Sequence, residues 1–377
     1  MDVLVVVVIV TALAFDFTNG FHDTANAMAT SIATRALRPR VAVAISAVLN
    51  LVGAFLSVEV AKTISNGLVD DAKITPAVIF GGLVGAILWN LLTWLLGLPS
   101  SSSHALFGGL IGATWIAAGA DAVRFAAVVE KVIIPAIASP VIAGAVAAAG
   151  TFVVYHLTRR ADQRGVRGGF RHGQVVSASL VSLAHGANDA QKTMGVITLV
   201  LITAGTLSPG VGPPLWVIFT SGLAIALGTY VGGWRIIRTV GHRLTRIEPQ
   251  QGFAAETSAA TVILASSHLG YPLSTTQVTS GAVIGSGIGK RLSEVRWGVA
   301  GRIAIAWLLT LPAAAVAGAL AGRVAISGTL GVLVVAFTLV ALAATFYAVS
   351  RRDRVDRHNV NDDEVGPRTS PKPTFAN

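Results

Sequence analysis

The amino-acid sequence predicts an all-α, polytopic membrane protein of about eleven spans (10–12), built as two inverted-topology repeats with discontinuous or re-entrant helices. Of the 377 residues, 53% are hydrophobic and only 12% are charged, and the mean hydropathy is +0.70. Ordinary soluble domains are less apolar and more charged than this. Two polar motifs also occur twice each, in the same order, inside apolar stretches. The composition predicts the membrane, and the repeated motifs predict two related halves.

Apolar stretches of about 20 residues, the length that crosses a bilayer as a helix, set the order of the expected elements. The segments 104–119 and 275–289 are short and follow polar Ser/Thr clusters, which favours one arm of a re-entrant hairpin over a full span. The charged segment 121–131 is expected to be an interfacial helix. From the N-terminus, the expected spans are 3–33, 41–61, 75–97, 104–119, 132–157, 175–205, 213–233, 253–270, 275–289, 299–321 and 328–350.

The first repeated motif lies in the first span and returns 166 residues later. Its first copy, at 19–30, reads N-G-F-H-D-T-A-N-A-M-A-T, and its second copy, at 185–196, reads H-G-A-N-D-A-Q-K-T-M-G-V. Asp16 precedes the first copy in the same apolar stretch, and Gly20 is expected to break the helix there. Ionisable groups at membrane depth mark substrate or ion pathways. Five spans separate the two copies, and an odd number reverses their direction, which predicts inverted halves.

The polar residues of this motif predict a site for a coupling cation or a proton. Asp and Asn side chains supply the hard oxygen ligands that suit Na⁺, Mg²⁺ or Ca²⁺. A protonated Asp that only hydrogen-bonds its neighbours is the alternative for each carboxylate, and a structural role is the alternative for each histidine. Glu256 is either a third coupling carboxylate or an interfacial residue. The candidate coupling residues are Asp23, Asn26, Asn188, Asp189, Lys192 and Glu256, and His22 and His185 are candidates for a metal or proton.

Lys192 takes the place that Asn26 holds in the first copy. A lysine at membrane depth needs a partner, such as a motif carboxylate. We therefore interpret Lys192 as a tethered cation that removes the need for one Na⁺. The alternative is that its side chain snorkels toward water and only balances charge.

The second repeated motif predicts an anion site. It reads L-P-S-S-S-S-H-A-L-F-G-G-L-I-G at 98–112 and Y-P-L-S-T-T-Q-V-T-S-G-A-V-I-G at 271–285. A proline followed by hydroxyl residues at the start of an apolar segment is typical of a helix N-terminus, where free N–H groups and the positive dipole end favour phosphate or sulfate. The alternative is that the hydroxyls only cap two buried helices. The candidate phosphate-binding residues are Ser101, Ser102, Ser103, Ser274, Thr275 and Thr276.

Lysine and arginine sort unevenly between the two sides of the membrane. With the N-terminus outside, 22 of the 28 basic residues fall in cytoplasmic loops and in the C-terminal tail, and five fall outside. Because positive residues stay on the cytoplasmic side, we expect an outside N-terminus and a cytoplasmic C-terminus in the plasma (cell inner) membrane. The expected organisation is a first repeat at 1–157, a basic cytoplasmic linker at 158–174 that acts as a hinge, a second repeat at 175–350 and a disordered tail at 351–377.

Several other classes of function fit the sequence poorly. The formal charge of +10 lies in short loops, without a basic face or an aromatic platform, so nucleic-acid binding is not expected. The chain has no Cys, which excludes thiol catalysis and thiolate metal sites. An intramembrane hydrolase would need Ser101 or Ser103 as nucleophile and His104 as base, but no third group accompanies them. A passive channel fits discontinuous inverted repeats less well than a carrier does.

With both motifs in view, the chain resembles the PiT family of inorganic phosphate transporters. G-F-H-D-T-A-N-A at 20–27 and H-G-A-N-D-A-Q-K at 185–192 look like its paired signatures, and P-S-S-S-S-H at 99–104 and P-L-S-T-T-Q at 272–277 resemble its Ser/Thr-rich helix starts. The resemblance covers roughly residues 10–350. His22 departs from the usual Asn of the first signature, and Gln191 and Lys192 depart from the usual residues of the second, which leaves the coupling ion open.

The resemblance implies a secondary transporter, not an enzyme, that imports inorganic phosphate by cation symport without a resident cofactor. Its bacterial members take up phosphate with protons, often as a neutral metal–phosphate complex, for example with Mg²⁺. Coupling to Na⁺ and a sulfate permease of the same fold are the alternatives. The expected partners are phosphate, the coupling cation and the lipid bilayer, and the resemblance leaves open whether the chain forms a homo-oligomer.

Overall fold

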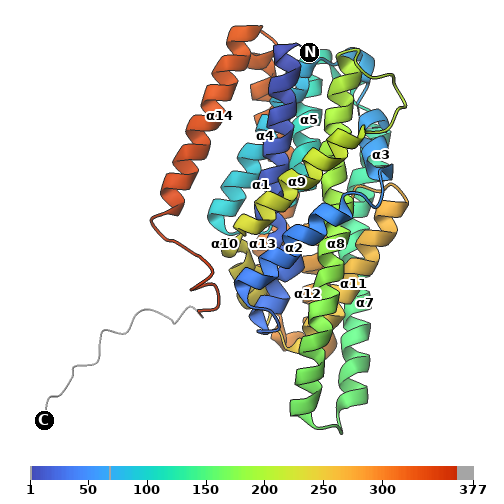
Figure 1. The fold of residues 1–377 in the computed structure, drawn as a ribbon, viewed down its shortest axis with the longest axis vertical. Coiled ribbons are helices and arrows are strands. Elements are labelled where there is room, and N and C mark those ends of the chain that lie inside the picture. The colour runs from blue at the N-terminus through green and yellow to red at the C-terminus, as the bar shows by residue number, and fades with distance from the viewer. Residues whose placement is uncertain (1, 68, 363–377) are drawn as a thin grey trace, which may run out of the picture.

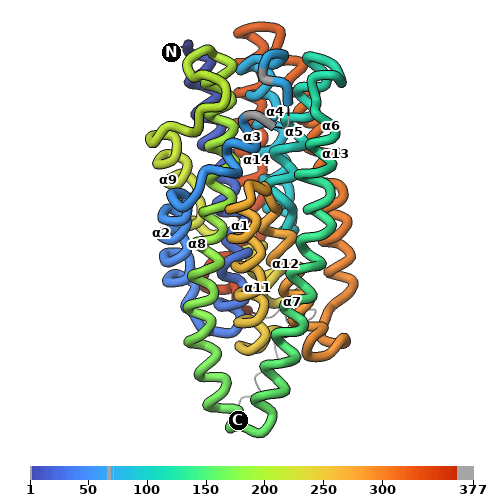
Figure 2. Tube along the Cα trace, turned by 90° about the vertical axis from the view of Figure 1, so that its right-hand side faces the viewer, coloured from blue at the N-terminus to red at the C-terminus, as the bar shows by residue number. Residues whose placement is uncertain are grey.

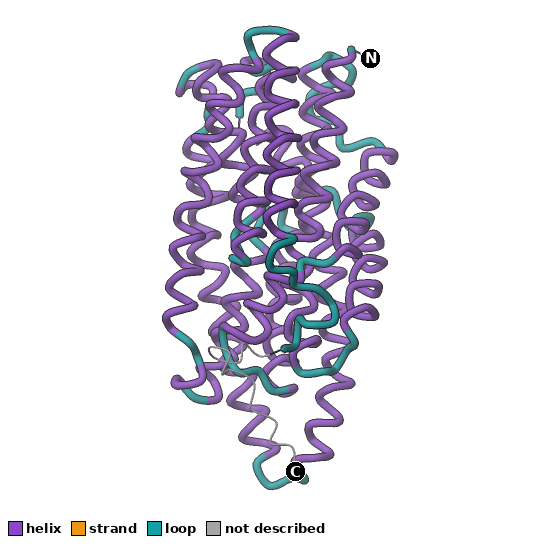
Figure 3. Tube along the Cα trace, turned by 90° about the vertical axis from the view of Figure 1, so that its left-hand side faces the viewer, coloured by secondary structure: helices purple, strands orange, loops and turns teal. Residues whose placement is uncertain are grey.

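The computed structural model describes residues 2–67 and 69–362, and over these residues it is built from helices, with two isolated β-bridges and no longer strand (Figure 3). Figure 1 shows an elongated bundle with the N-terminus at its upper end. The helices are α1 (Val3–Ala33), α2 (Pro39–Gly53), α3 (Glu59–Gly67), α4 (Pro76–Leu96), α5 (Ser102–Ala118), α6 (Phe125–Val128), α7 (Ile134–Thr158), α8 (Gln163–Thr203), α9 (Leu215–Val231), α10 (Trp234–Arg238), α11 (Pro249–His268), α12 (Thr275–Lys290), α13 (Trp297–Ala325) and α14 (Thr329–Ser350).

Several of these helices are long and apolar enough to cross a membrane, as expected for a multi-pass membrane protein. By length and composition, the described residues contain five such helices, or up to six if α9 and the segment Trp234–Arg243, bent by 62°, count as one span. The expected eleven spans are therefore not confirmed. Part of the difference is physical, because α5 and α12 have only 17 and 16 residues, too few to cross the bilayer alone.

The two helices that carry the first motif are long and unbroken. α1 has 31 residues and α8 has 41, and they run in opposite directions along the bundle (Figure 1). The prediction that Gly20 breaks the helix was wrong. Gly20 instead lets α1 approach α9 closely, because a Cβ there would meet the carbonyl oxygen of Ile225. Gly186 has the same role between α8 and α2, where a Cβ would meet the backbone of Asn50.

The two short segments form the second arms of helical hairpins, as expected. α4 and α5 make one hairpin in the upper part of the bundle, and α11 and α12 make the other in the lower part (Figure 2). Their tips, at residues 97–101 and 269–274, are directed toward each other at mid-height, because Ser103 and His104 contact Leu273 and Gln277. The hairpin geometry therefore brings the starts of α5 and α12 together inside the protein.

Each sequence half contributes one long helix, α7 or α13, to the hairpin of the other half. α13 packs against α4 and α5, whereas α7 packs against α11 and α12. Both contacts are backbone-close at glycine pairs, Gly318 with Gly109 and Gly144 with Gly285. The two halves therefore interlock rather than lie beside each other as separate units.

Two expected elements differ from the structure in the first half. The expected span 41–61 is two helices, α2 and α3, separated by residues 54–58. The expected interfacial helix at 121–131 was also wrong, since Phe125–Thr158 runs as one 34-residue helical segment through α6, a π-helical turn at Val129–Ile133, and α7. Glu130 is exposed and Lys131 is half-buried on that turn, so their charges did not need to end the helix.

The expected linker and tail are more ordered than predicted. Residues 163–174 form the first turns of α8, whose N-terminus is capped by Asp162, so only 159–162 separate α7 from α8. The tail residues 351–362 pack on α10: Arg238 donates to the carbonyl of Asn359 at 2.5 Å, and Val360 is fully buried. Residues 363–377 lie outside the described part.

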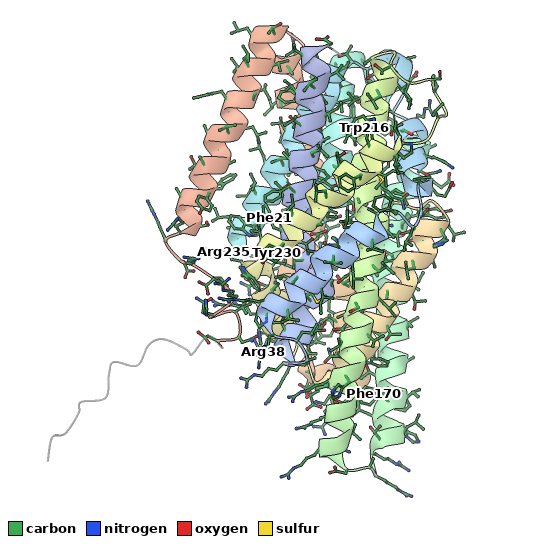
Figure 4. The ribbon with its side chains drawn as sticks, viewed as in Figure 1. Phe21, Arg38, Phe170, Trp216, Tyr230 and Arg235 are labelled. Carbon is green, nitrogen blue, oxygen red and sulfur yellow. The ribbon has the colours of Figure 1, made fainter. Side chains whose placement is uncertain are left out.

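Figure 4 shows Arg38 and Arg235 below Phe21 and Trp216, in the lower part of the bundle.

Candidate functional site

The two repeated carboxylates meet in the interior, between α1 and α8. Asp23 and Asp189 are 1% and 0% exposed, and His185 lies between them. The His185 Nε2 atom is 3.0 Å from the Asp189 Oδ2 atom and 4.0 Å from the Asp23 Oδ2 atom. Ligand atoms of these three residues all lie within 4.8 Å of one another. Two carboxylates and an imidazole at this spacing can hold a cation or share protons.

The N-termini of α5 and α12 face these carboxylates in a mirrored arrangement. Ser102 Oγ donates to Asp23 Oδ2 at 2.8 Å, and Thr275 Oγ1 donates to Asp189 Oδ2 at 3.0 Å. Thr275 also lies 3.4 Å from Asp23 Oδ2. Each motif hydroxyl thus bonds the carboxylate of its own half, and the two carboxylates share Thr275.

The residues beside these hydroxyls shape the helix starts. Ser101 Oγ accepts from the backbone N–H of His104 at 3.1 Å, and Ser274 Oγ accepts from that of Gln277 at 3.3 Å, which is the N-cap geometry predicted for both. Ser103 Oγ donates to the carbonyl of Leu273 at 3.2 Å and so joins the two hairpin tips. Capping therefore belongs to Ser101 and Ser274, while Ser102 and Thr275 point to the carboxylates.

The two candidate asparagines both reach a hairpin. Asn26 Nδ2 donates to Thr276 Oγ1 at 3.0 Å, across to the start of α12. Asn188 Nδ2 donates to Ser267 Oγ at 2.9 Å, near the end of α11. Asn26 therefore borders the site directly, whereas Asn188 ties α8 to the second hairpin.

The two histidines hold the carboxylates in place. His22 Nδ1 is 2.7 Å from Asp23 Oδ1, and its Nε2 is 3.1 Å from Thr93 Oγ1 on α4. His185 Nδ1 is 3.1 Å from Asn50 Oδ1 on α2. Each imidazole thus links a carboxylate to a neighbouring helix.

Lys192 lies inside the site, fully buried, with its ammonium in an ion pair with Asp189. This placement contradicts the alternative in which its side chain snorkels toward water. Gln191, the other departure from the family signature, points away: its Oε1 accepts from the backbone N–H of Val60 at 2.9 Å and caps α3.

Glu256 lies in a separate buried polar cluster, at the level of Thr30 and Ser31 on α1. Its carboxylate accepts hydrogen bonds from Thr30 at 2.5 Å, Ser31 at 2.6 Å, Ser177 at 2.5 Å and Gln174 at 3.1 Å. It is 3% exposed, so it is not the interfacial residue that the sequence left as an alternative. The structure does not bring Glu256 into contact with Asp23 or Asp189.

Sequence reasoning missed several residues that complete the site. Asn19 Nδ2 lies 3.5 Å from Asp189 Oδ2, and Ser100 Oγ donates to Thr93 Oγ1 at 2.8 Å beside His22. Asn19 stands in the first motif, and Ser100 opens the serine run, so their positions could have suggested them. Thr93 lies in an apolar helix with no signal of its own in the sequence.

Comparison with known proteins shows the family to which the chain is related. The chain matches the family described as "Phosphate transporter family" over residues 19–168 and 158–318. A protein of Mycobacterium bovis described as "Probable low-affinity inorganic phosphate transporter" is 58% identical over 366 residues, covering 96% of this chain and 88% of the relative. A protein of Rhizobium meliloti with the same description is 46% identical over 318 residues, covering 84% and 95%. The solved structure titled "The sodium-dependent phosphate transporter" superposes with a TM-score of 0.72 at 25% identity, covering 86% of this chain and 99% of that one.

Proposed function

Because the chain belongs to the phosphate transporter family, whose members are transporters and not enzymes, we propose that it imports inorganic phosphate by alternating access in symport with a cation. The observation that carries this proposal is the mirrored pair of contacts from Ser102 to Asp23 and from Thr275 to Asp189. In this proposal the two hydroxyls are anion donors and the two carboxylates are cation ligands of one buried centre. A carrier that moves both ions in one step needs that arrangement.

The phosphate site in this proposal lies between the starts of α5 and α12. The first backbone N–H groups of each helix have no partner within the helix, and the positive ends of both dipoles point at the same place. Ser102 and Thr275 can rotate their hydroxyls from a carboxylate to a phosphate oxygen. Monohydrogen phosphate can also donate its own hydrogen to Asp23 or Asp189, which sulfate cannot do.

Both carboxylates would repel phosphate unless positive charge lies between them and the anion. On the Asp189 side, the buried ammonium of Lys192 supplies that charge from the chain itself. On the Asp23 side, the nearest cationic candidates are His22 and His185, both of which can also be neutral. We therefore place the transported cation on the Asp23 side, beside Asn26, and take a proton as that cation.

A metal–phosphate complex as cargo is compatible with the same residues. Asp23, His185 and Asp189 provide two carboxylates and one imidazole within 4.8 Å, a donor set suited to a divalent cation. A phosphate that arrives with its own Mg²⁺ would bring the charge that the Asp23 side lacks. In that case uptake would depend on the divalent cation as well as on pH.

The test is radiolabelled phosphate uptake by the purified protein in proteoliposomes, with imposed pH or Na⁺ gradients and with or without Mg²⁺. We expect uptake driven by an acidic exterior and unaffected by replacing Na⁺ with choline. Absence of phosphate uptake under every gradient would contradict transport. Uptake that requires Na⁺ would contradict proton coupling and leave the phosphate site intact.

A further inference from the structure

A pocket lined by arginines lies at the end of α1 opposite the N-terminus. Its volume is about 520 Å³. Its walls come from four parts of the chain: the turn after α1, the segment from α10 to residue 247, the start of α13 and the tail at 361–362. Among the described residues, one carboxylate lines this basic pocket, that of Asp362. The basic residues of the lining are Arg35, Arg238, His242, Arg243, Arg246 and Arg296.

The positive charge of this pocket is not balanced by the residues around it. In the described part of the chain, Arg35, Arg238, Arg246 and Arg296 form no ion pair with an Asp or Glu. These four arginines and Asp362 leave three more positive than negative formal charges in the lining. The Nε atom of Arg238 is buried and has no hydrogen-bond partner among the described residues. A buried donor without an acceptor beside unbalanced positive charge indicates a site for an anion.

Arg35 is held in a backbone conformation that costs free energy. Its φ is 60°, and it is the one residue other than glycine with a positive φ among the described residues. It follows Thr34, the C-cap of α1, at a position where glycine is usual. In this left-handed region the Cβ of an L-residue lies close to the following carbonyl, so glycine would be less strained there. An arginine in such a conformation points to a use for its side chain.

The wall opposite Arg35 is fixed by hydrogen bonds. Arg238 donates to the carbonyl of Asn359, and the His242 Nε2 atom lies 2.9 Å from the Asn361 Oδ1 atom. Arg296, at the start of α13, donates to the carbonyl of His242 at 3.3 Å. The tail, α10 and α13 are therefore joined around the pocket before any ligand enters it.

The lining favours a soluble ligand with more than one phosphate group. Guanidinium groups bind phosphate oxygens with two parallel hydrogen bonds, which makes arginine the usual residue of phosphate sites. A phosphate group carries about −1.5 to −2 charges at pH 7, so about two groups match the excess charge. The volume lies within the range of small-molecule sites. Ile247 is the one large apolar side chain in the described lining, which leaves little surface for a lipid chain.

The orientation of the protein in the membrane does not explain this pocket. Basic residues collect on the cytoplasmic side in general. The exposed Arg159 and Arg160, in the connection between α7 and α8 at the lower end of the bundle, already serve that purpose (Figure 1). Membrane orientation requires neither a strained arginine nor several arginines around one cavity.

We propose that this basic pocket binds a soluble anion with about two phosphate groups and that the bound anion restrains transport. The pocket is separate from the transport site, and the inference goes beyond the proposed function. The anion would link the end of α1, which carries Asp23, to the start of α13, which covers the first hairpin. Alternating access requires such elements to move relative to each other, so the link would slow the cycle.

The test is calorimetric titration of inorganic pyrophosphate into the full-length protein in nanodiscs of phosphatidylcholine, where both ends of the protein are accessible. We expect the parent to bind pyrophosphate and Arg35→Gly to bind it at least about tenfold more weakly, because a contact between two charged groups is lost. The unfolding temperature of Arg35→Gly without pyrophosphate should stay close to that of the parent. Glycine removes the strain, which offsets the entropy that it adds to the unfolded chain.

Two control variants should keep the parental affinity for pyrophosphate. Arg160→Gly removes the same charge at an exposed position of the α7–α8 connection. Ser102→Ala changes the proposed transport site and leaves the basic pocket intact. If Arg35→Gly does not fold, Arg246→Gln replaces it, since Arg246 is exposed and also lines the pocket.

Uptake measurements test the restraint itself. With pyrophosphate on both sides of proteoliposomes, phosphate uptake by the parent should slow by a larger factor than uptake by Arg35→Gly. Unchanged parental uptake at saturating pyrophosphate would overturn the restraint. A parent that moves no phosphate would contradict the proposed function and leave the binding result in place.

The binding outcomes decide the site and its ligand. Parental affinity for pyrophosphate in both Arg35→Gly and Arg246→Gln would overturn the proposal. A loss confined to Ser102→Ala would place pyrophosphate in the transport site and would also overturn it. A phosphatidylglycerol molecule held by the parent and not by Arg35→Gly, seen by native mass spectrometry, would show that the pocket takes a lipid headgroup and would overturn a soluble ligand.

Discussion

The Asp23 and Asp189 sides of the site come from the same motif but differ three residues further along the helix. On α1 that residue is Asn26, whose amide reaches across to Thr276 in the other half. On α8 it is Lys192, whose ammonium turns back to Asp189. The hydroxyl donors remain equivalent, at 2.8 Å from Ser102 to Asp23 and 3.0 Å from Thr275 to Asp189.

This difference shows that a repeated motif can keep its geometry after its charges have diverged. Backbone packing around the motif is shared, since Gly20 and Gly186 each bring their helix onto a neighbour. Charge is not shared, because one side of the site carries the buried ammonium of Lys192. Equivalent positions therefore predict where a residue lies, while the identity of the residue decides what it does.

Removing either carboxylate should have the largest effect. We expect Asp23→Asn and Asp189→Asn each to abolish coupled phosphate uptake while the protein still inserts, because each loses a charge at the site. Only Asp189→Asn leaves the Lys192 ammonium buried without its partner, which costs about 3–5 kcal/mol. Thermal unfolding in detergent should therefore show a much larger loss of stability for Asp189→Asn. Full phosphate accumulation by both variants would contradict the assignment.

Replacing Lys192 with asparagine should make the Asp189 side of the site resemble the Asp23 side. The parent should take up phosphate equally in Na⁺ and choline media, and Lys192→Asn should either lose uptake or become stimulated by Na⁺, because an alkali ion can then occupy the vacated space. Lys62→Asn, the same change at an exposed lysine on α3, serves as the control and should behave as the parent. Unchanged uptake by Lys192→Asn in both media, or a parent that needs Na⁺, would rule out the tethered-cation hypothesis.

Removing the hydroxyl of Ser102 or of Thr275 should weaken the apparent affinity for phosphate, by similar amounts in the two variants. Losing one hydrogen bond to a charged group of about 1.5 kcal/mol predicts an increase of about tenfold in half-saturation for Ser102→Ala and for Thr275→Ala. Backbone donors remain, so uptake should not vanish. Ser139→Ala, at a buried serine on α7, should leave half-saturation unchanged. If both site variants keep the parental value, phosphate binds elsewhere.

Removing the N-caps should have the smallest effect. Ser101→Ala and Ser274→Ala each lose a bond to the backbone, at 3.1 Å and 3.3 Å, which costs about 1 kcal/mol of stability. Because these side chains cap and do not face the carboxylates, thermal stability should fall equally in both variants with little change in half-saturation. A loss confined to one variant would show that the hairpin starts are not equivalent.

Residue patterns in the sequence predicted the centre of the protein well. Pro99 and Pro272 followed by hydroxyl residues placed the starts of α5 and α12, because capping depends on local geometry that the sequence carries. The repeat placed Asp23 and Asp189 in related positions, and the structure brings them together. The partners of Glu256 could not be predicted, since its four donors come from two other helices that only tertiary packing brings near it.

The errors concern one glycine and two charged segments. Glycine either ends a helix or lets another backbone approach it, and the sequence of one helix does not contain the neighbour that decides between these roles at Gly20. The charged segment 121–131 was taken as a separate interfacial helix, and the basic segment 158–174 was taken as a linker. Charged side chains that reach the surface are compatible with a continued helix, as the exposed Glu130 and the half-buried Lys131 show. The division into halves and the orientation in the membrane stay predictions.

The packing of α13 on the first hairpin and of α7 on the second has a consequence for how the chain is synthesised. The hairpin of α4 and α5 is complete by residue 118, yet the helix that covers it begins only at Trp297. During synthesis the first hairpin must therefore wait, with Gly108 and Gly112 uncovered, until nearly four-fifths of the chain has left the ribosome. The second hairpin meets α7, which is already present, as soon as it forms. The half that is translated first should thus be the last to finish packing, and a chain truncated before α13 should leave that half open to degradation.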